Sequence, residues 1–299
     1  MPLVSFDHLF QRADTLPRPV PIAVAGGADR TVLESLRTAS NRGWVAPFVV
    51  GVEGDIRQAA DSSGIDLRGF TLVDADDSAT TAVALVRSGK ARLLMKGQIA
   101  TPALMKAMLD PALGLRTEHV ICQIILMELT SIERRFLLAD TGVCITPTLP
   151  QKIDILQSTV ALAHRLGVEC PAVASMAATE TVTPSMPETS DAAELERRNR
   201  AGAITGCLVR GPLSFDLAFD IDAAAKKKLH DHEFGVADIL LFPNLLSANL
   251  TVKAIMYTAA CRFGGVLCGA ACPVVFMSRA DTTATRLNSL ALACASCEP

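Results

Sequence analysis

Short apolar segments closed by glycine alternate along this sequence with longer segments of helical character. PVPIAVAGG (19–27), WVAPFVVG (44–51) and ARLLMKG (91–97) are three such apolar segments, each followed by helix-forming sequence. Strands that alternate with helices form a parallel sheet covered by helices on both faces. The alternation extends to ACPVVFMS (271–278). We therefore predict an α/β protein built from two doubly wound parallel-sheet domains.

Local signals support the individual elements. Asp29 stands where the N-cap of a helix is expected, Gly64 closes a helix, and Pro102 suits a first helical turn. The longest apolar stretch, VICQIILMEL (120–129), is rich in β-branched residues. We interpret it as a strand buried on both faces. The proline-rich stretch ITPTLP (145–150) predicts a domain boundary.

Composition excludes several classes of protein. The formal net charge of −3 argues against a general nucleic-acid surface, which requires a clustered basic excess, and Lys226–Lys228 is interpreted as a solvated helix face. No segment approaches the ~20 apolar residues of a membrane helix, and MPLVSFDHLF lacks the pattern of a signal peptide. We expect a cytoplasmic protein without nucleic-acid or membrane partners.

The cysteines and histidines do not predict a metal site. Nine scattered cysteines suit core positions in a reducing compartment. Cys294-Ala-Ser-Cys297 is a single CxxC, and His230-Asp-His232 is a weak pair in a polar segment. The nucleotide-binding GxGxxG and P-loop patterns and the GxSxG elbow are also absent from the sequence.

Polar residues at the ends of predicted strands are the candidates for chemistry, because open α/β sheets bind ligands at the carboxyl ends of their strands. Lys96 ends one strand and Thr101 starts the next helix, a pairing that suits an anion. Alternatively, Lys96 extends to solvent and Thr101 caps the helix. Arg116, in a turn before the next strand, suits a phosphate or a plain surface role.

Two further strand ends are ambiguous in the same way. Asp140 in LLADTGV either orients a ligand or binds its own turn. In VVFMSRADTTATRLNSLALA, Ser278 and Arg279 follow a strand directly, and Asp281 is the expected N-cap of the last helix. A cation just before a helix N-terminus is unfavourable unless it shares an anion with the free N–H groups there. We therefore expect this corner to bind negative charge.

The same strand ends carry a resemblance to a known family. Seven segments occur in the order found in the phosphate acetyl/butyryltransferase family: LLMKGQIATPALMKAMLD, GLRTEHV, LADTGVCITPTLPQK, PSMPETSDAA, RGPLSFD, ADILLFPNLLSANLTVKA and FMSRADTTATRLNSLALA. The resemblance runs from about residue 90 to the end of the chain and is closer to the phosphate butyryltransferase branch. It implies reversible transfer of a short-chain acyl group between coenzyme A and inorganic phosphate, with acyl-CoA as substrate and no bound cofactor or metal.

The resemblance also implies an architecture and a site. The fold is expected to be isocitrate/isopropylmalate dehydrogenase-like, a homodimer with an interdomain cleft. In it, residues 1–144 and 279–299 form the first domain and 145–278 the second. Residues 278, 279 and 281 are the implied catalytic group. Phosphate is assigned to Lys96, Thr101, Arg116 and Arg279, and the coenzyme A side of the cleft to Asp140, Asn244, Asn249 and Lys253.

Two positions depart from the family pattern. The acetyltransferase branch has an aspartate seven residues after the serine, where this chain has Thr285, and Ala248 replaces an expected glycine. The general base is therefore open: Asp281, another carboxylate, or none, since a free thiol is partly ionised. Ala248 narrows the cleft or restricts a turn that needs positive φ. A catalytically weak relative that binds coenzyme A or acyl phosphate, and a metal- and NAD-dependent dehydrogenase of the same fold, are the alternative functions.

Overall fold

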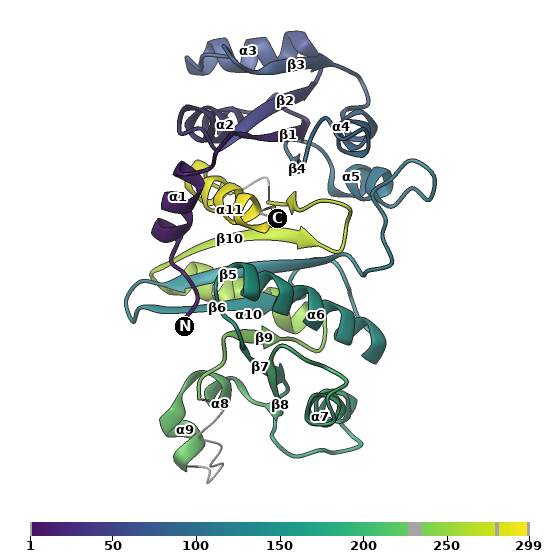
Figure 1. Cartoon of the computed structure of the whole chain (residues 1–299), viewed down its shortest axis with the longest axis vertical. Helices are drawn as coiled ribbons and strands as arrows, with labels where there is room; N and C mark the ends of the chain where they lie inside the picture. Colours follow the sequence, from purple (N-terminus) through teal and green to yellow (C-terminus); the bar gives the residue numbers. More distant parts are fainter. Residues whose placement is uncertain (1, 227–234, 279–280, 298–299) are drawn as a thin grey trace. The chain divides into compact units, whose positions relative to one another are not determined.

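The computed structural model describes residues 2–226, 235–278 and 281–297 of the 299-residue chain. The chain divides into two compact units (Figure 1). The terminal unit comprises Phe6–His119 and the chain from Phe263 onward, and the central unit comprises Val120–Arg262 with the first five residues. These boundaries lie earlier in the chain than the predicted ones at 144/145 and 278/279. The first does so because the strand pair that precedes the proline-rich stretch pairs with residues 239–241 of the central sheet. The second does so because residues 266–267 pair with residues 274–275 of the terminal sheet.

The terminal unit contains a sheet with the strand order β3-β2-β1-β4-β11-β10. Its strands are β1 (Val20–Ala25), β2 (Val45–Gly51), β3 (Thr71–Asp74), β4 (Leu93–Lys96), β10 (Cys261–Cys268) and β11 (Val274–Val275). Its helices are α1 (Phe6–Asp14), α2 (Arg30–Asn41), α3 (Glu53–Ser63), α4 (Ser78–Arg87), α5 (Thr101–Met108) and α11 (Thr283–Ser296). Helix α11 packs against α1, α2 and β11, whereas α4 packs against α5, β1 and β4.

The central unit contains strands in the order β5-β6-β9-β7-β8. They are β5 (Cys122–Leu129), β6 (Arg134–Ala139), β7 (Ala172–Met176), β8 (Leu208–Leu213) and β9 (Ile239–Leu241). The helices are α6 (Leu149–Arg165), α7 (Pro187–Arg200), α8 (Phe215–Phe219), α9 (Ile221–Lys226) and α10 (Leu245–Thr258). Helices α6 and α10 contact β6, and α7 contacts β8.

Local sequence signals act as predicted at several element ends. Asp29 caps α2, with its Oδ1 accepting the Val32 N–H at 3.0 Å. Gly64 ends α3 in the left-handed conformation with φ 65°, and Pro102 lies in the first turn of α5. The apolar stretch at 120–129 contains β5, which is buried along almost its whole length. These elements follow from short-range backbone preferences.

The mixed α/β class is confirmed, but the prediction of wholly parallel sheets is wrong. β5 pairs antiparallel with β6, and β10 pairs antiparallel with β11. Only four residues, with Glu133 at φ 51°, connect β5 to β6. A connection this short can join only antiparallel neighbours, since a parallel crossover needs about a dozen residues. The other described pairings, from β3 to β11 and from β6 to β8, are parallel.

Candidate active site

The carboxyl ends of β1, β4 and β11 define the first candidate site, within the terminal unit. The three strands are parallel neighbours, with Ala25 beside Lys96 and Val275 beside Met95. Gly26, Gly97 and Ser278 therefore leave the sheet at one edge. Crossover sheets of this kind bind ligands at that edge.

Lys96 is the buried charge of this edge. Its residue is 2% exposed, so the alternative in which it extends to solvent is wrong. Its Nζ donates to the carbonyl of Gly97 at 3.4 Å. Gly97 permits a close approach of two strand ends, because a Cβ there would lie 2.1 Å from the carbonyl oxygen of Gly26. The β4 end thus places an ammonium group within closely packed backbone, where a charge acts strongly on a neighbouring anion.

Thr101 and Arg116 take positions that their sequence context left open. Thr101 is exposed and is the first residue of α5, while Ala100 is the N-cap and makes no side-chain cap bond, so Thr101 does not cap this helix. Arg116 forms an isolated backbone bridge with Ala270, in the segment that leads into β11. Ser278 comes after β11, so the backbones of Arg116 and Ser278 lie at opposite ends of that strand. Within the described residues, no hydrogen bond or ion pair engages the exposed Arg116 guanidinium.

The corner after β11 is closed by Asp281. Its Oδ2 accepts the backbone N–H of Ser278 at 2.6 Å, and its own N–H donates to the Ser278 carbonyl at 3.2 Å. The N-cap of α11 is Thr282, whose hydroxyl accepts the Thr285 N–H, so the prediction that Asp281 caps this helix is wrong. Arg279, the predicted phosphate ligand, lies outside the described residues.

The position where the acetyltransferase pattern has an aspartate is part of this cap. Thr285 is 9% exposed, and its hydroxyl lies 3.0 Å from that of Thr282. The hydroxyl pair supplies no carboxylate to accept a proton. The Asp281 carboxylate accepts the Ser278 N–H and so helps to fix the backbone of this corner.

Arg286 belongs to the same corner and was missed by sequence reasoning. It is 1% exposed, and its Nη2 donates to the Ser278 carbonyl at 3.3 Å while its Nε donates to the Thr31 hydroxyl at 3.1 Å. Burial lowers the pKa of Arg286, and the charges of Asp29 and Asp281 oppose that shift. The available signal was a single arginine in the apolar run RLNSLALA, 286–293.

The second candidate site lies at the carboxyl edge of the central unit, where Asp140 follows β6. Asp140 is 3% exposed. Its Oδ1 accepts the N–H groups of Gln123, Gly142 and Val143 at 2.9, 2.9 and 3.2 Å, and its Oδ2 accepts that of Cys144 at 2.6 Å. The geometry agrees with the interpretation that Asp140 binds its own turn. Burial, together with the Asp140 charge and hydrogen bond, raises the pKa of the Cys144 thiol to about 11.

Helix α10 brings three predicted residues to this second edge. Asn244 is its N-cap, with Oδ1 accepting the Ser247 N–H at 3.0 Å. One turn later, the Asn249 amide donates to the Thr141 carbonyl at 3.3 Å, next to Asp140. Lys253 is exposed and lies four residues after Asn249 on the same helix. Ala248 is buried within α10, so the expectation of a turn that needs positive φ there is wrong.

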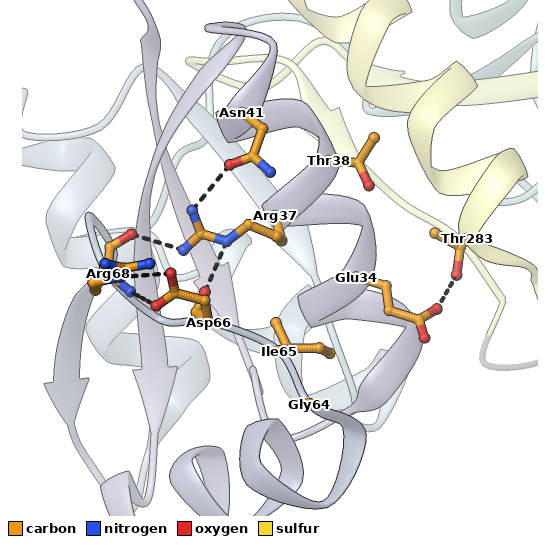
Figure 2. Close-up of a pocket in the computed structure, with 9 residues that line it drawn as sticks. All are labelled: Glu34, Arg37, Thr38, Asn41, Gly64, Ile65, Asp66, Arg68 and Thr283. Atoms are coloured by element: carbon orange, nitrogen blue, oxygen red, sulfur yellow. Dashed lines mark hydrogen bonds and ion pairs between the residues drawn. The ribbon is translucent and has the colours of Figure 1, made fainter.

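A separate cavity of ≈ 620 Å³ opens beside α2 in the terminal unit (Figure 2). Figure 2 shows the Arg37 guanidinium bonded to Asn41, while Thr283 reaches Glu34 from the neighbouring helix. Arg37 also donates to the carbonyls of Asp66 and Arg68, both at 2.7 Å. Every nitrogen of this arginine already has an acceptor, and Arg68, which also lines the cavity, pairs with Asp66 at 2.7 Å, so the cavity offers an anion little. None of the predicted site residues that the structure describes lines it.

The described residues contain neither a metal-binding cluster nor a membrane-spanning helix. Within the described ranges, His, Cys, Asp and Glu side chains form no group of three or more that could hold a metal ion; the predicted weak pair at 230 and 232 lies outside them. Nor does any helix there have the length and apolarity needed to cross a bilayer.

Comparison with known proteins gives consistent similarities. Residues 75–294 match the family described as "Phosphate acetyl/butaryl transferase". The chain is 38% identical over 275 residues to a phosphate butyryltransferase of Clostridium acetobutylicum, covering 91% of each protein. It is 35% identical over 273 residues to a phosphate acetyltransferase of Thermotoga maritima, covering 91% of this chain and 93% of the relative.

A solved structure is similar over nearly the whole chain. It is a branched-chain phosphotransacylase from Enterococcus faecalis, with a TM-score of 0.81 and 28% sequence identity. The match covers 93% of this chain and 99% of the solved one. Sequence and fold therefore point to the same group of proteins.

Proposed function

Because this chain belongs to the phosphate acetyl/butyryltransferase family, we propose that it transfers a short-chain acyl group between coenzyme A and inorganic phosphate. The protein is a phosphate acyltransferase, an enzyme of the reaction acyl-CoA plus phosphate gives acyl phosphate plus coenzyme A. The observation that carries the assignment to the terminal unit is the buried Lys96 ammonium at the strand edge that Ser278 also occupies.

The chemistry assigns a role to each group of the terminal edge. A phosphate oxygen attacks the thioester carbonyl carbon, a tetrahedral oxyanion forms, and the carbon–sulfur bond breaks to release the thiolate. Lys96 and Arg279 neutralise phosphate, and the Ser278 hydroxyl donates to the oxyanion or the sulfur. Arg116, whose backbone pairs ahead of β11, extends its exposed side chain to the same phosphate. Thr101 contributes the free N–H groups of the first turn of α5.

The leaving thiolate needs no base in this direction, and the reverse direction requires only that coenzyme A loses its proton. A thiol is partly ionised near neutral pH. We therefore propose that Asp281 holds the backbone of Ser278 in place and does not act as a strong base. This reading accounts for the absence of an aspartate at position 285.

The central edge is proposed to bind coenzyme A. Lys253 supplies an exposed cation for the phosphate groups of coenzyme A, and Asn249 supplies an amide beside the turn that Asp140 closes. Asn244 sets the start of α10, which carries both. The proposal includes an isocitrate/isopropylmalate dehydrogenase-like arrangement, in which the two edges face one cleft and bring both substrates to attack distance.

We also propose a cytoplasmic homodimer. Support for self-association comes from large apolar side chains that α10 leaves exposed: Leu246 at 69%, Leu250 at 59% and Tyr257 at 81%. Their spacing of four and seven residues places them along one helix face, which Lys253 shares, so the proposed interface adjoins the proposed coenzyme A site. A face of this kind is unusual on a monomer that buries its apolar residues well.

The enzyme assay tests a panel of substrates, acetyl-, propionyl-, butyryl- and branched acyl-CoA, each with phosphate or arsenate and without added metal. Turnover is followed by the loss of the thioester's ultraviolet absorbance, because the nine cysteines of the chain would react with thiol reagents. We expect phosphate-dependent thioester loss, abolished by Arg279→Ala and reduced at least about a hundred-fold by Lys96→Met. Adjacent chain lengths should differ by ~10–200-fold at most, since one methylene contributes ~1–3 kcal/mol.

One observation favours a second candidate, a weak relative that binds coenzyme A or acyl phosphate without turnover. Thr285 stands in the helix cap where the acetyltransferase pattern has an aspartate. This candidate predicts micromolar coenzyme A binding in calorimetry together with thioester loss no faster than in buffer. Turnover with any acyl-CoA of the panel would eliminate it.

A further inference from the structure

Among the described residues of the Ser278 corner, Arg286 is the buried guanidinium whose bonding is incomplete. Its Nη1 is buried and has no hydrogen-bond partner among the described residues. Burying a guanidinium costs free energy, and apolar residues of similar size often serve stability better. A lone charge on α11, whose neighbours Leu290 to Ala295 are apolar or thiol side chains buried to 3% or less, therefore calls for a reason other than packing.

Its two bonded nitrogens connect segments that are distant in the sequence. Nε donates to the Thr31 hydroxyl, a residue 255 positions away, and that hydroxyl donates to Asp29 at 2.6 Å. Nη2 donates to the carbonyl of Ser278. Arg286 thus ties the capped start of α2 to Ser278, all within the terminal unit.

Ser278 is held on both of its backbone groups as a result. The Asp281 carboxylate accepts its N–H at 2.6 Å, and its carbonyl receives Arg286 Nη2 at 3.3 Å and the Asp281 N–H at 3.2 Å. Asp281 alone would close the corner on itself. Among the described residues, Arg286 joins Ser278 itself to α2 through a side chain, while the Thr283 hydroxyl joins the start of α11 to Glu34 of α2 at 2.8 Å.

We propose that Arg286 is a positioning residue for acyl transfer: it acts through Ser278, by holding the carbonyl of the backbone from which the serine hydroxyl projects. This inference rests on the proposed function. Its cationic group also offsets the negative charges of Asp29 and Asp281, which would otherwise oppose the approach of phosphate. The consequence is that Arg286 contributes to kcat without touching either substrate.

The test compares Arg286→Met and Arg286→Lys with wild type and with Arg134→Met. Arg134 is the matched control because its buried Nε also lacks a partner among the described residues, but it lies at the start of β6 in the central unit. The assay uses butyryl-CoA and phosphate, and folding is checked by circular dichroism. We expect Arg286→Met to lower kcat about a hundred-fold, the scale of an ångström-sized misplacement, with both KM values within about three-fold.

The other variants separate positioning from stability. Arg286→Lys, which keeps the charge and one bond, should recover about ten-fold of the lost kcat. Arg134→Met should keep kcat within about two-fold of wild type, whatever the change in its melting temperature. Thr31→Val removes the acceptor of Nε without removing Arg286, so it carries the test if Arg286→Met does not fold. It should lower kcat about ten-fold at unchanged KM.

Failure of the inference is distinct from failure of the proposed function. A wild-type chain that turns over none of the acyl-CoA panel defeats the proposed function, and this inference with it. An active wild type whose folded Arg286→Met variant keeps kcat within about three-fold overturns the inference alone. So does a kcat loss in Arg286→Met no larger than in Arg134→Met, or an unchanged kcat in Thr31→Val.

Discussion

Replacing Asp140 by asparagine tests whether its carboxylate holds the turn at the end of β6. Oδ1 would remain as an amide oxygen and could keep the N–H groups of Gln123, Gly142 and Val143. The position of Oδ2 would become an NH2 group, which cannot accept the Cys144 N–H now 2.6 Å away. The variant thus loses one charge-assisted bond and leaves one donor unsatisfied.

The expected cost follows from these two losses. A hydrogen bond to a charged group contributes ~1.5–3 kcal/mol, and an unsatisfied buried donor costs ~1–3 kcal/mol, so we expect a net loss of about 3 kcal/mol. At roughly 2–4 °C per kcal/mol for a domain of this size, the melting temperature of the central unit should fall by about 6–12 °C. Asp140→Ala leaves all the N–H groups of the turn without the carboxylate, so its melting temperature should fall further.

Calorimetry measures the change, and fluorescence locates it. The single tryptophan, Trp44, immediately precedes β2 in the terminal unit, so its fluorescence emission reports unfolding of that unit and not of the central one. Asp110→Asn is the control: Asp110 also accepts two backbone N–H groups of its own turn, those of Ala112 and Leu113, but it is fully exposed. Its melting temperature should not change measurably. An Asp140→Asn variant that melts within about 2 °C of wild type would refute the reasoning.

Three further predictions concern other parts of the chain. Gly97→Ala forces apart the ends of β1 and β4, so its free energy of unfolding in urea should fall by ~1–3 kcal/mol and its turnover should be reduced. In the control Gly54→Ala, the new Cβ meets open space in α3, and the free energy of unfolding should stay the same or rise by up to ~1 kcal/mol. Equal urea midpoints for the two variants would contradict the close approach at Gly97. Burial raises the pKa of Cys207 to about 11 and that of Cys272 to about 12. The unfolded thiols titrate near ~8.5, so the contribution of these buried neutral thiols to stability is complete below that pH and is lost as the pH rises toward 11. Over that range, the urea midpoint of wild type should therefore fall more steeply than the urea midpoint of a Cys207→Ala/Cys272→Ala variant. Lys253→Ala should raise the KM for acyl-CoA with stability unchanged within ~0.5 kcal/mol, and Lys90→Ala, an exposed lysine of the terminal unit, should change neither; equal effects on KM would remove Lys253 from the proposed coenzyme A site.

Sequence reasoning succeeded where the deciding interaction is local. The cap at Asp29 and the left-handed end at Gly64 each depend on a few neighbouring backbone groups, and both are as predicted. It failed for the direction of β5 and β6, because the short link between them contains Glu133 at positive φ and no glycine that would mark a tight turn. It also missed Arg286, since nothing near that residue in the sequence indicates that Thr31 is its partner.

The candidate residues also differ in how much of their bonding capacity the fold consumes, and this could not be predicted from residue type. Asp140 uses both oxygens on its own turn, and the Asn244 oxygen is taken by the Ser247 N–H. In contrast, Arg116 and Lys253 are exposed, and the described residues offer their side chains no hydrogen bond or ion pair. A group that is already satisfied organises the backbone, whereas an available cation can exchange water for phosphate oxygens. Substitutions of the first kind should therefore act mainly on stability, and substitutions of Arg116 or Lys253 mainly on substrate affinity.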